Sequence, residues 1–353
     1  MASGTFSLYR LPYIALAVVI DCMKPYHIFR LSLVSKKSHR IARSMRKKEG
    51  KIYLIFAQKE RINIVYRGCS YILFIIPDHL VEQEGEVFEL LKIKNAAFNT
   101  EMKRETDEMY IQRNCNMFAV LTTLLEYAIS FYGQPIHFVK IMPGNRWELT
   151  KRAIEWVLSR QETIPDCSFR CETNSDVQFR YFLDKIGNRV SKQLAIDTVS
   201  ISENFQHSFR QPLTAVITRM GCKPWLNINN LYSLNSQYID IKNTKFTCAD
   251  MNSFLKNWLQ GGNSELRCLF LRLPLTYDEV VLDGLEAVQR KSVNKIEYNH
   301  FKNNIFKFSS SFELKKNDGT IASLGVENGI NRQFVMVVWP DLLNKPYPAH
   351  EME

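Results

Sequence analysis

The feature of this sequence that most constrains its fold is a recurring unit of one short strand and one helix. Segments rich in β-branched and aromatic residues alternate with segments of helical period between residues 135 and 273. The strand candidates are residues 135–141, 166–171, 194–201, 225–231 and 266–273, with 237–243 as an additional one. The first four are centred roughly 30 residues apart, a spacing typical of proteins in which β/α units stack on one another. We therefore expect a β/α repeat-like domain, and a doubly wound α/β sheet is the alternative.

The segments between these strands carry apolar stripes at helical spacing. The stripes are Leu149, Ala153, Trp156 and Val157; Phe179, Phe182, Leu183 and Ile186; and Met251, Phe254, Leu255, Trp258 and Leu259. Such a unit is of leucine-rich-repeat-like type, although the strict leucine consensus is absent. Thr247 or Asp250 is suited to cap the third helix. Because a stripe of this kind faces a core, we expect Trp156 and Trp258 to lie buried between stacked units.

The positive charge of the chain is concentrated near its N-terminus. The 353 residues carry a formal net charge of +10, and residues 1–60 alone contribute +9 from 12 Lys and Arg against three acidic residues. The rest is close to neutral, so it does not predict a long groove that follows a nucleic-acid backbone. We expect an acidic partner near the N-terminus. A nucleic-acid-binding module built on the basic residues 36–48 is the competing class.

The first fifty residues predict a small module of short helices. The apolar residues of the first helix are Leu16, Val19, Ile20 and Met23. Pro12 is suited to its first turn, and Pro25 ends it. An apolar stretch at 28–34 and the basic stretch at 36–48 predict further helices. A module of this size needs a neighbouring domain or a partner for stability.

The rest of the chain divides by composition. Residues 51–76 read as three strands, whereas residues 81–115 are charged and mixed and are expected to form a helix followed by loops. The C-terminal part is β-rich again, and Asp318-Gly319 marks a hairpin in a sheet that we expect to cap the repeat. The predicted fold class is therefore α+β. The predicted parts are a helical module at 5–50, a β-rich connecting region at 51–116 and the β/α domain at 117–345.

The sequence contains no motif that predicts catalysis, a metal or a cofactor. Phosphate-binding glycine loops, nucleophile elbows and zincin pairs are absent. The eight cysteines include no CxxC pair, so we expect free, mostly buried thiols. The apolar stretch 11–20 has the length of a signal-peptide core, but no cleavage motif follows and the chain has no N-x-S/T sequon. We expect a non-catalytic protein without metal, cofactor or membrane partner.

Two segments of the chain are recognisable. The N-terminal residues read FSLYRLPYIALAVVIDCMKPYHIFRLSLVSKKSHRIAR, with Leu11-Pro12 opening an apolar helix and a break at Pro25. This segment resembles an F-box. Residues 225–273 read WLNINNLYSLNSQYIDIKNTKFTCADMNSFLKNWLQGGNSELRCLFLRL, and residues 317–340 begin NDGT and end FVMVVWP. These segments resemble the second type of F-box-associated domain, which occurs in the F-box proteins that are expanded in nematodes.

The resemblance implies the substrate-recognition subunit of an SCF-type (Skp–cullin–F-box) E3 ubiquitin ligase. Its F-box would bind a Skp-type adaptor and, through it, cullin and RING subunits, while the associated domain would hold a target protein. The adaptor-binding residues so implied are Leu11, Pro12, Ile20, Met23, Ile28, Leu31 and Val34. The protein would act in the cytoplasm, the nucleus or both, and its target and substrate-binding residues stay unassigned. An F-box scaffold that does not lead to ubiquitination is the second alternative.

Overall fold

The structure of the chain, a computed structural model, divides into two compact units, residues 1–162 and residues 163–353. It describes residues 8–45, 49–57, 60–66, 68–77, 89–93, 96–103, 108–113, 116–142, 144, 146–171, 175–198, 201–202, 204–209, 211–221, 225–242, 244–272, 279–300, 304–327 and 333–348. Both units combine helices with strands. The fold class is α+β, as the sequence predicts.

Three short helices begin the N-terminal unit. They are α1 (Tyr13–Cys22), α2 (Pro25–Val34) and α3 (Lys36–Met45), and a 3-10 turn, η1 (Leu8–Arg10), precedes them. Pro25 stands in the first turn of α2, where a helix does not need the missing N–H. Ser35 is extended between α2 and α3, and its Oγ accepts a hydrogen bond from the backbone N–H of Ser38 at 3.0 Å. The prediction of a three-helix module is confirmed.

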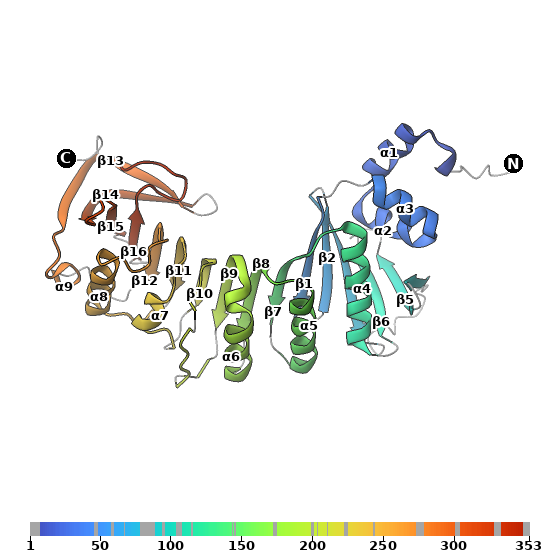
Figure 1. Cartoon of the computed structure of the whole chain (residues 1–353), viewed down its shortest axis with the longest axis horizontal. Coiled ribbons are helices and arrows are strands. Elements are labelled where there is room, and N and C mark those ends of the chain that lie inside the picture. The colour runs from blue at the N-terminus through green and yellow to red at the C-terminus, as the bar shows by residue number, and fades with distance from the viewer. Residues whose placement is uncertain are drawn as a thin grey trace. The chain divides into compact units, whose positions relative to one another are not determined.

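A mixed sheet and two helices form the rest of the N-terminal unit, and the strand order of this sheet is β7-β1-β2-β3-β6-β5-β4. Its strands are β1 (Lys51–Phe56), β2 (Glu60–Tyr66), β3 (Cys69–Pro77), β4 (Glu89–Ile93), β5 (Ala96–Lys103), β6 (Glu108–Arg113) and β7 (Ile136–Ile141). Helix α4 (Met117–Tyr132) crosses from β6 to β7, and α5 (Trp147–Arg160) follows β7 (Figure 1). β1 pairs antiparallel with β2 and parallel with β7. Strands from both sides of residue 116 therefore belong to one sheet, and the three-part division of the chain stays a prediction.

Strands occupy much of the segment for which we expected a helix and loops. β4 pairs with β5 and β5 with β6, both antiparallel, and β6 pairs parallel with β3. Met109 and Ile111 are buried, whereas Glu108 and Tyr110, which alternate with them, are half-exposed. This alternation is too short to stand out in sequence, so the helix and loops expected over residues 81–115 are wrong for the part of that segment that the structure describes. Residues 78–88 lie outside the described residues.

Five parallel strands begin the C-terminal unit and pair in chain order. They are β8 (Ile164–Cys171), β9 (Val190–Thr198), β10 (Val216–Gly221), β11 (Tyr238–Lys242) and β12 (Cys268–Arg272). The connections carry α6 (Asp176–Lys185) with the 3-10 turn η3 (Gly187–Arg189), α7 (Ile228–Tyr232) and α8 (Cys248–Leu259) (Figure 1). Because parallel crossovers are right-handed, this order puts the helices on one face of the sheet. A doubly wound sheet would reverse its strand order, so the repeat-like arrangement is the correct one.

The strand expected at 225–231 is wrong, because a helix occupies its place. Asn227 and Asn230 form a capping box, in which each side-chain oxygen accepts from the other's backbone N–H at 3.1 Å, and α7 begins between them. Trp225 and Leu231 are buried on either side of this turn, so their apolar pattern is that of a core and not of a strand. The strand between β9 and β11 in the sheet is instead β10 (Val216–Gly221), which precedes the expected segment in the chain.

Four antiparallel strands and a short helix complete the C-terminal unit. They are α9 (Glu279–Leu282), β13 (Val288–His300), β14 (Asn304–Lys315), β15 (Ile321–Glu327) and β16 (Gln333–Val338). β16 pairs antiparallel with β12, so this set covers the last repeat strand as expected. The predicted hairpin joins β14 to β15, and Gly319 adopts a φ of 91° that favours glycine. A core joins both strand sets through Tyr238, Cys268, Phe270, Tyr298, Val335, Val337 and Trp339.

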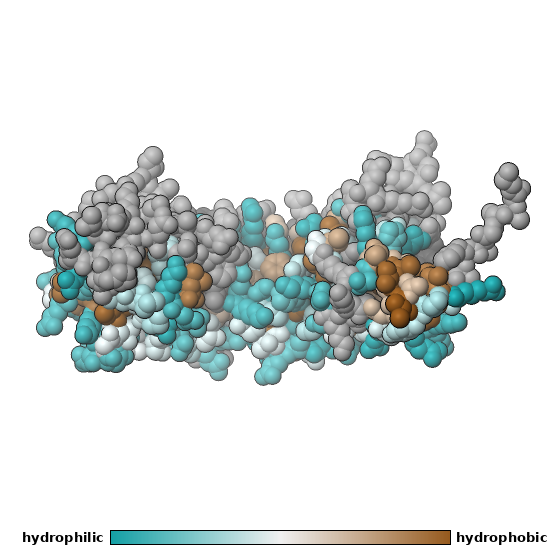
Figure 2. All heavy atoms as spheres, turned by 90° about the horizontal axis from the view of Figure 1, so that it is seen from above, coloured by the Kyte–Doolittle hydropathy of each residue, from teal (hydrophilic) through white to brown (hydrophobic). Residues whose placement is uncertain are grey.

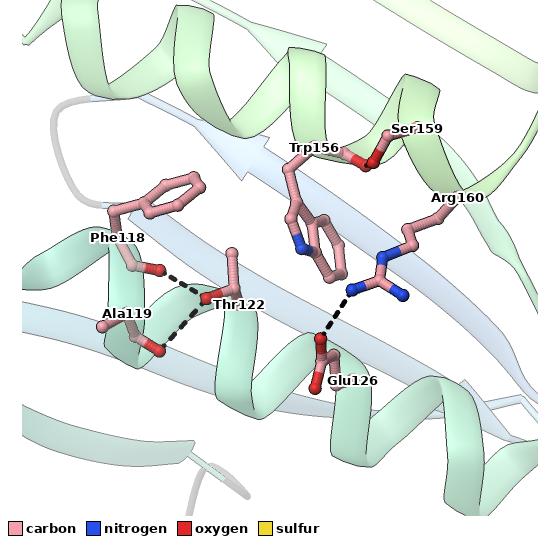
Figure 3. A network of polar contacts seen from close by, with 7 residues as sticks. All are labelled: Phe118, Ala119, Thr122, Glu126, Trp156, Ser159 and Arg160. Carbon is pink, nitrogen blue, oxygen red and sulfur yellow. Dashed lines mark hydrogen bonds and ion pairs between the residues drawn. The ribbon is translucent and has the colours of Figure 1, made fainter.

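The two tryptophans expected in the core have different surroundings. Trp258 on α8 is fully buried, which confirms its prediction. Trp156 is only half-buried, and Figure 3 shows its indole between α4 and α5, next to the guanidinium of Arg160. The Arg160 guanidinium carbon lies 5.4 Å from the Trp156 ring centroid, and its Nη2 lies 2.9 Å from Oε1 of Glu126. The prediction that Trp156 is buried is therefore wrong, because the ion pair of Arg160 and Glu126 covers its ring only in part.

Across the described ranges, every helix is too short or too polar to cross a bilayer.

Candidate functional site

Helix α1 has apolar residues on all sides, which is unusual for a helix at a protein surface. Its ten residues, YIALAVVIDC, include a single charged one, Asp21. Leu16 and Ile20 are buried in the three-helix module, at the i and i+4 positions of one face. Ile14 and Val18, also four residues apart, point the other way and are 78% and 57% exposed. Figure 2 shows hydrophobic side chains gathered over these N-terminal helices.

We call the residues Tyr13, Ile14, Val18 and Val19 the α1 patch. All four are large hydrophobic or aromatic side chains that remain accessible to solvent. An exposed apolar surface of this kind marks an interaction site in a soluble protein, whereas scattered single residues do not. The α1 patch can therefore bind an apolar surface of a partner, and it offers no group for catalysis.

The residues predicted for adaptor binding fall into three groups. Ile20 and Ile28 are buried inside the chain, where they stabilise the three-helix module and present no surface. Leu11, Met23 and Leu31 are half-buried, whereas Pro12 and Val34 are exposed. As a set of adaptor contacts, these residues stay a prediction.

The sequence reasoning missed Tyr13, Ile14 and Val18. Periodicity placed Leu16, Val19, Ile20 and Met23 on the inner face of α1; Leu16 and Ile20 are buried, but Val19 is exposed. The signal that would have found them is the near absence of polar residues from every face of α1.

A hydrogen-bond network attaches the module to α4. Ser32 Oγ donates to the backbone oxygen of Phe29 at 2.6 Å, so the contact of 2.7 Å between Ser32 Oγ and the Tyr127 hydroxyl has Tyr127 as donor. Because Tyr127 donates its hydroxyl proton to Ser32, the Tyr127 oxygen acts as the acceptor towards His39, and it accepts from Nδ1 of His39 at 3.1 Å. This assigns the Nδ1–H form to His39. Burial raises the pKa of Tyr127 to about 12, and the hydrogen bond with Ser32 lowers it by less, so the phenol stays a neutral donor.

Aromatic rings surround this network. Phe29 packs edge-on against Tyr127 at 5.5 Å and lies 5.7 Å from Tyr71 on β3, measured between ring centroids. His39 lies 5.4 Å from Phe131, also on α4. The helices α2 and α3 thus bury one face against α4 and the sheet of the N-terminal unit. The neighbouring domain that a module of this size needs is therefore part of the same chain.

Helix α3 presents a basic face to solvent. Lys36, Lys37, Arg40 and Arg43 are exposed, and α3 contains no acidic residue. The last three cations of the basic stretch, residues 46–48, lie outside the described residues. An acidic surface is the electrostatic complement of this helix.

A hollow lies in the C-terminal unit, at the end of α8. Its volume is about 450 Å³, and Trp258, Arg267, Lys316 and Asp318 line it. The Lys316 ammonium lies 4.2 Å from the Trp258 ring centroid. Desolvation lowers the pKa of Lys316, and Asp318 acts in the opposite direction. Cation and carboxylate lie together there, so the hollow does not select for one sign of charge.

Groups of metal-ligating side chains do not occur among the described residues. The five cysteines with described surroundings are free thiols, and Cys167, Cys248 and Cys268 are buried. Burial raises the pKa of both Cys167 and Cys268, so these thiols are protonated and unreactive.

Comparison with known proteins agrees with this geometry. A family model of the F-box domain matches residues 8–50, which contain α1, α2 and α3. A second family model, described as F-box associated, matches residues 204–271, which span β10, α7, β11, α8 and most of β12. The chain is an F-box protein.

The relatives of this F-box protein are nematode proteins. It is 24% identical to the uncharacterized protein F59B2.9 of Caenorhabditis elegans over 361 residues, which cover 96% of the chain and 80% of that protein. It is 20% identical to the Skn-1 dependent zygotic transcript 15 protein of the same species over 321 residues, or 82% of the chain and 85% of that protein. No solved structure matches the chain. The relatives support its place among the F-box proteins expanded in nematodes.

The family sets the general role of this F-box protein. An F-box combined with an F-box-associated domain is typical of substrate-recognition adaptors of SCF complexes, which are generally non-catalytic. The F-box domain generally binds Skp-type adaptors.

Proposed function

We propose that this chain recruits a target protein to an SCF-type ubiquitin ligase and binds its Skp-type adaptor through the α1 patch. The observation that carries the proposal is the exposure of Ile14 and Val18 on a helix of the F-box domain. Pro12 and Val34, which were expected at the interface, are accessible on the same module. Cullin and RING subunits would join through the adaptor.

The energy available from the α1 patch fits a specific interface. Full burial of one large aliphatic side chain contributes about 1.5–3 kcal/mol, and Ile14 and Val18 are both largely exposed in the free chain. Truncating an anchor at the centre of an interface typically costs about 2 kcal/mol, which is roughly a thirtyfold loss of affinity. We therefore expect the α1 patch to hold the main anchors of adaptor binding.

The basic face of α3 supports an acidic adaptor. Exposed charges act mainly on the association rate, and salt screens them over about 10 Å at 0.1 M. Neutralising Lys37 and Arg43 to Gln should therefore slow association and weaken its salt dependence, with little change in the dissociation rate. Tight RNA binding that the same substitutions abolish would instead favour the nucleic-acid-binding alternative.

The chain itself would contribute no bond chemistry. Holding a target close to the charged ubiquitin-conjugating enzyme raises the effective concentration of the target's lysines, which is a proximity effect. We place target recognition in the C-terminal unit, because the F-box-associated match lies there. Action in the cytoplasm, the nucleus or both is part of the proposal.

Adaptor affinity of substituted full-length chains tests the proposal. Ile14→Ser combined with Val18→Ser should weaken binding to purified Skp-type adaptor at least thirtyfold. Val177→Ser is the matched control, because Val177 is 74% exposed but lies on α6 in the C-terminal unit. Unchanged affinity in the double variant would contradict the proposal, provided that its melting temperature equals that of the parent chain.

A reconstituted ligase separates a receptor from a scaffold. The chain with adaptor, cullin and RING subunits should transfer ubiquitin to a protein that co-purifies with the C-terminal unit, and the Ile14/Val18 variant should not. Assembly of the complex without any ubiquitin transfer would favour the scaffold alternative.

A further inference from the structure

A cavity of about 520 Å³ lies in the N-terminal unit, at the junction of α2 and α3. The side chains that matter for its chemistry are Ser35, Lys36, His39, Arg40, Lys92 and Tyr127. They come from the end of the F-box, from β4 and from α4. Pockets for small molecules typically measure about 300–1,000 Å³, so this volume suits a small ligand.

The cavity has a uniform sign of charge. Lys36 and Arg40 lie one turn apart on the same face of α3, and Lys92 approaches from β4. None of the described residues that line the cavity is acidic. This distinguishes it from the hollow at Trp258, where Asp318 accompanies the cations. Three cations that converge from two elements favour an anion with more than one negative charge.

One wall of the cavity is held in place before any ligand binds. Tyr127 donates to Ser32 and accepts from His39, so these three side chains have defined orientations. Ser35 is likewise fixed by its contacts with Ser38, at 2.8 Å between the hydroxyls. A preorganised wall reduces the entropy that binding costs.

We propose that this cavity binds a small organic or inorganic anion that carries phosphate groups. A phosphate oxygen pair matches the planar fork of the Arg40 guanidinium, and the two ammonium groups act as point charges on the remaining oxygens. A single carboxylate would leave most of the positive charge unmatched. The ligand would connect α3 of the F-box with β4 of the sheet and so stabilise their attachment.

Calorimetric titration of the full-length chain with inorganic pyrophosphate tests the proposal. Binding should saturate at 0.15 M salt, the physiological range, and raise the melting temperature. Arg40→Gln combined with Lys92→Gln should weaken it at least tenfold, because α3 and β4 each lose a cation that lines the cavity. Lys37→Gln combined with Arg43→Gln is the matched control: it removes the same net charge, here entirely from α3, but neither residue lines the cavity, and affinity should change less than about twofold.

Three results would overturn the proposal. They are no saturable binding below ~1 mM pyrophosphate, an equal loss in both pairs of variants, and tighter binding of citrate than of pyrophosphate, which would show a carboxylate site. Circular dichroism of each variant would verify its fold. Ile14→Ser combined with Val18→Ser, the variant expected to lose adaptor binding, should keep its pyrophosphate affinity because neither residue lines the cavity, so failure of the anion site and failure of the proposed ligase role are distinguishable.

Discussion

The hydroxyl oxygen of Tyr127 on α4 lies 2.7 Å from Oγ of Ser32 on α2. The two residues are 95 positions apart in sequence, and their contact joins the F-box to α4 within the N-terminal unit. The network continues to His39 on α3 at 3.1 Å. One phenol on α4 thus contacts two of the three F-box helices, which makes the F-box part of the N-terminal unit and not an appendage.

Tyr127→Phe should lower the free energy of unfolding by about 1–2 kcal/mol, because His39 loses its acceptor and Ser32 its donor in a buried place. Chemical denaturation of the full chain measures the change. Tyr13→Phe is the control, since Tyr13 is 69% exposed and should shift stability by less than about 0.5 kcal/mol. Equal stability of the Tyr127 variant and the parent would show that the network does not hold the F-box in place.

Ile20→Ala and Val34→Ala should have opposite consequences. Ile20 is fully buried, so its truncation leaves a cavity that lowers stability by about 2–4 kcal/mol. Val34 is 73% exposed, so its truncation should leave the melting temperature unchanged and weaken adaptor binding. Thermal melts and adaptor titrations of both variants check this separation. A stability loss at Val34 that matches the loss at Ile20 would contradict it.

Trp258→Ala should lower stability by about 3–5 kcal/mol through lost core volume. Trp156→Ala should cost clearly less, because its ring is half-buried and is covered in part by Arg160. Denaturation of the two variants side by side gives the comparison. Similar losses would mean that the α4–α5 contact in Figure 3 is packed as tightly as the C-terminal core.

Glu313→Gln should change how stability depends on pH. Burial raises the pKa of Glu313, and hydrogen bonds from Ser311 and Ser323 together with the charge of Arg290 lower it by less. The folded state therefore holds this proton more tightly than the unfolded state. The unfolding free energy then falls as pH rises from about 4, the usual range for Glu, through the raised pKa.

The Gln variant lacks this loss, so its melting temperature relative to the parent should increase with pH over that window and then level off. Melts between pH 4 and pH 8 measure the difference. Glu265→Gln removes an exposed carboxylate of the same unit and is the control for the loss of one negative charge. A flat difference for Glu313→Gln would contradict the prediction.

Much of the fold follows from local signals in the sequence. Thr247 and Asp250, the two residues predicted as alternative caps of α8, together form its capping box, and the apolar stripe from Met251 to Trp258 is buried. Such signals involve residues within one or two helical turns of each other, so they can be read from the sequence without knowledge of the tertiary contacts. At 225–231 the local reading failed, since the capping box of Asn227 and Asn230 outweighs a strand-like apolar pattern.

The sequence by itself determined the helical module, the repeated β/α unit, the concentration of charge at the N-terminus and the resemblance to F-box proteins. Only the tertiary structure decided which side of α1 is free. Its residues are apolar on every face, so periodicity grouped Val19, which is exposed, with Leu16 and Ile20, which are buried. The cavity between Arg40 and Lys92 also exists only in three dimensions, because packing of α3 near β4 brings together charges that no short-range pattern connects.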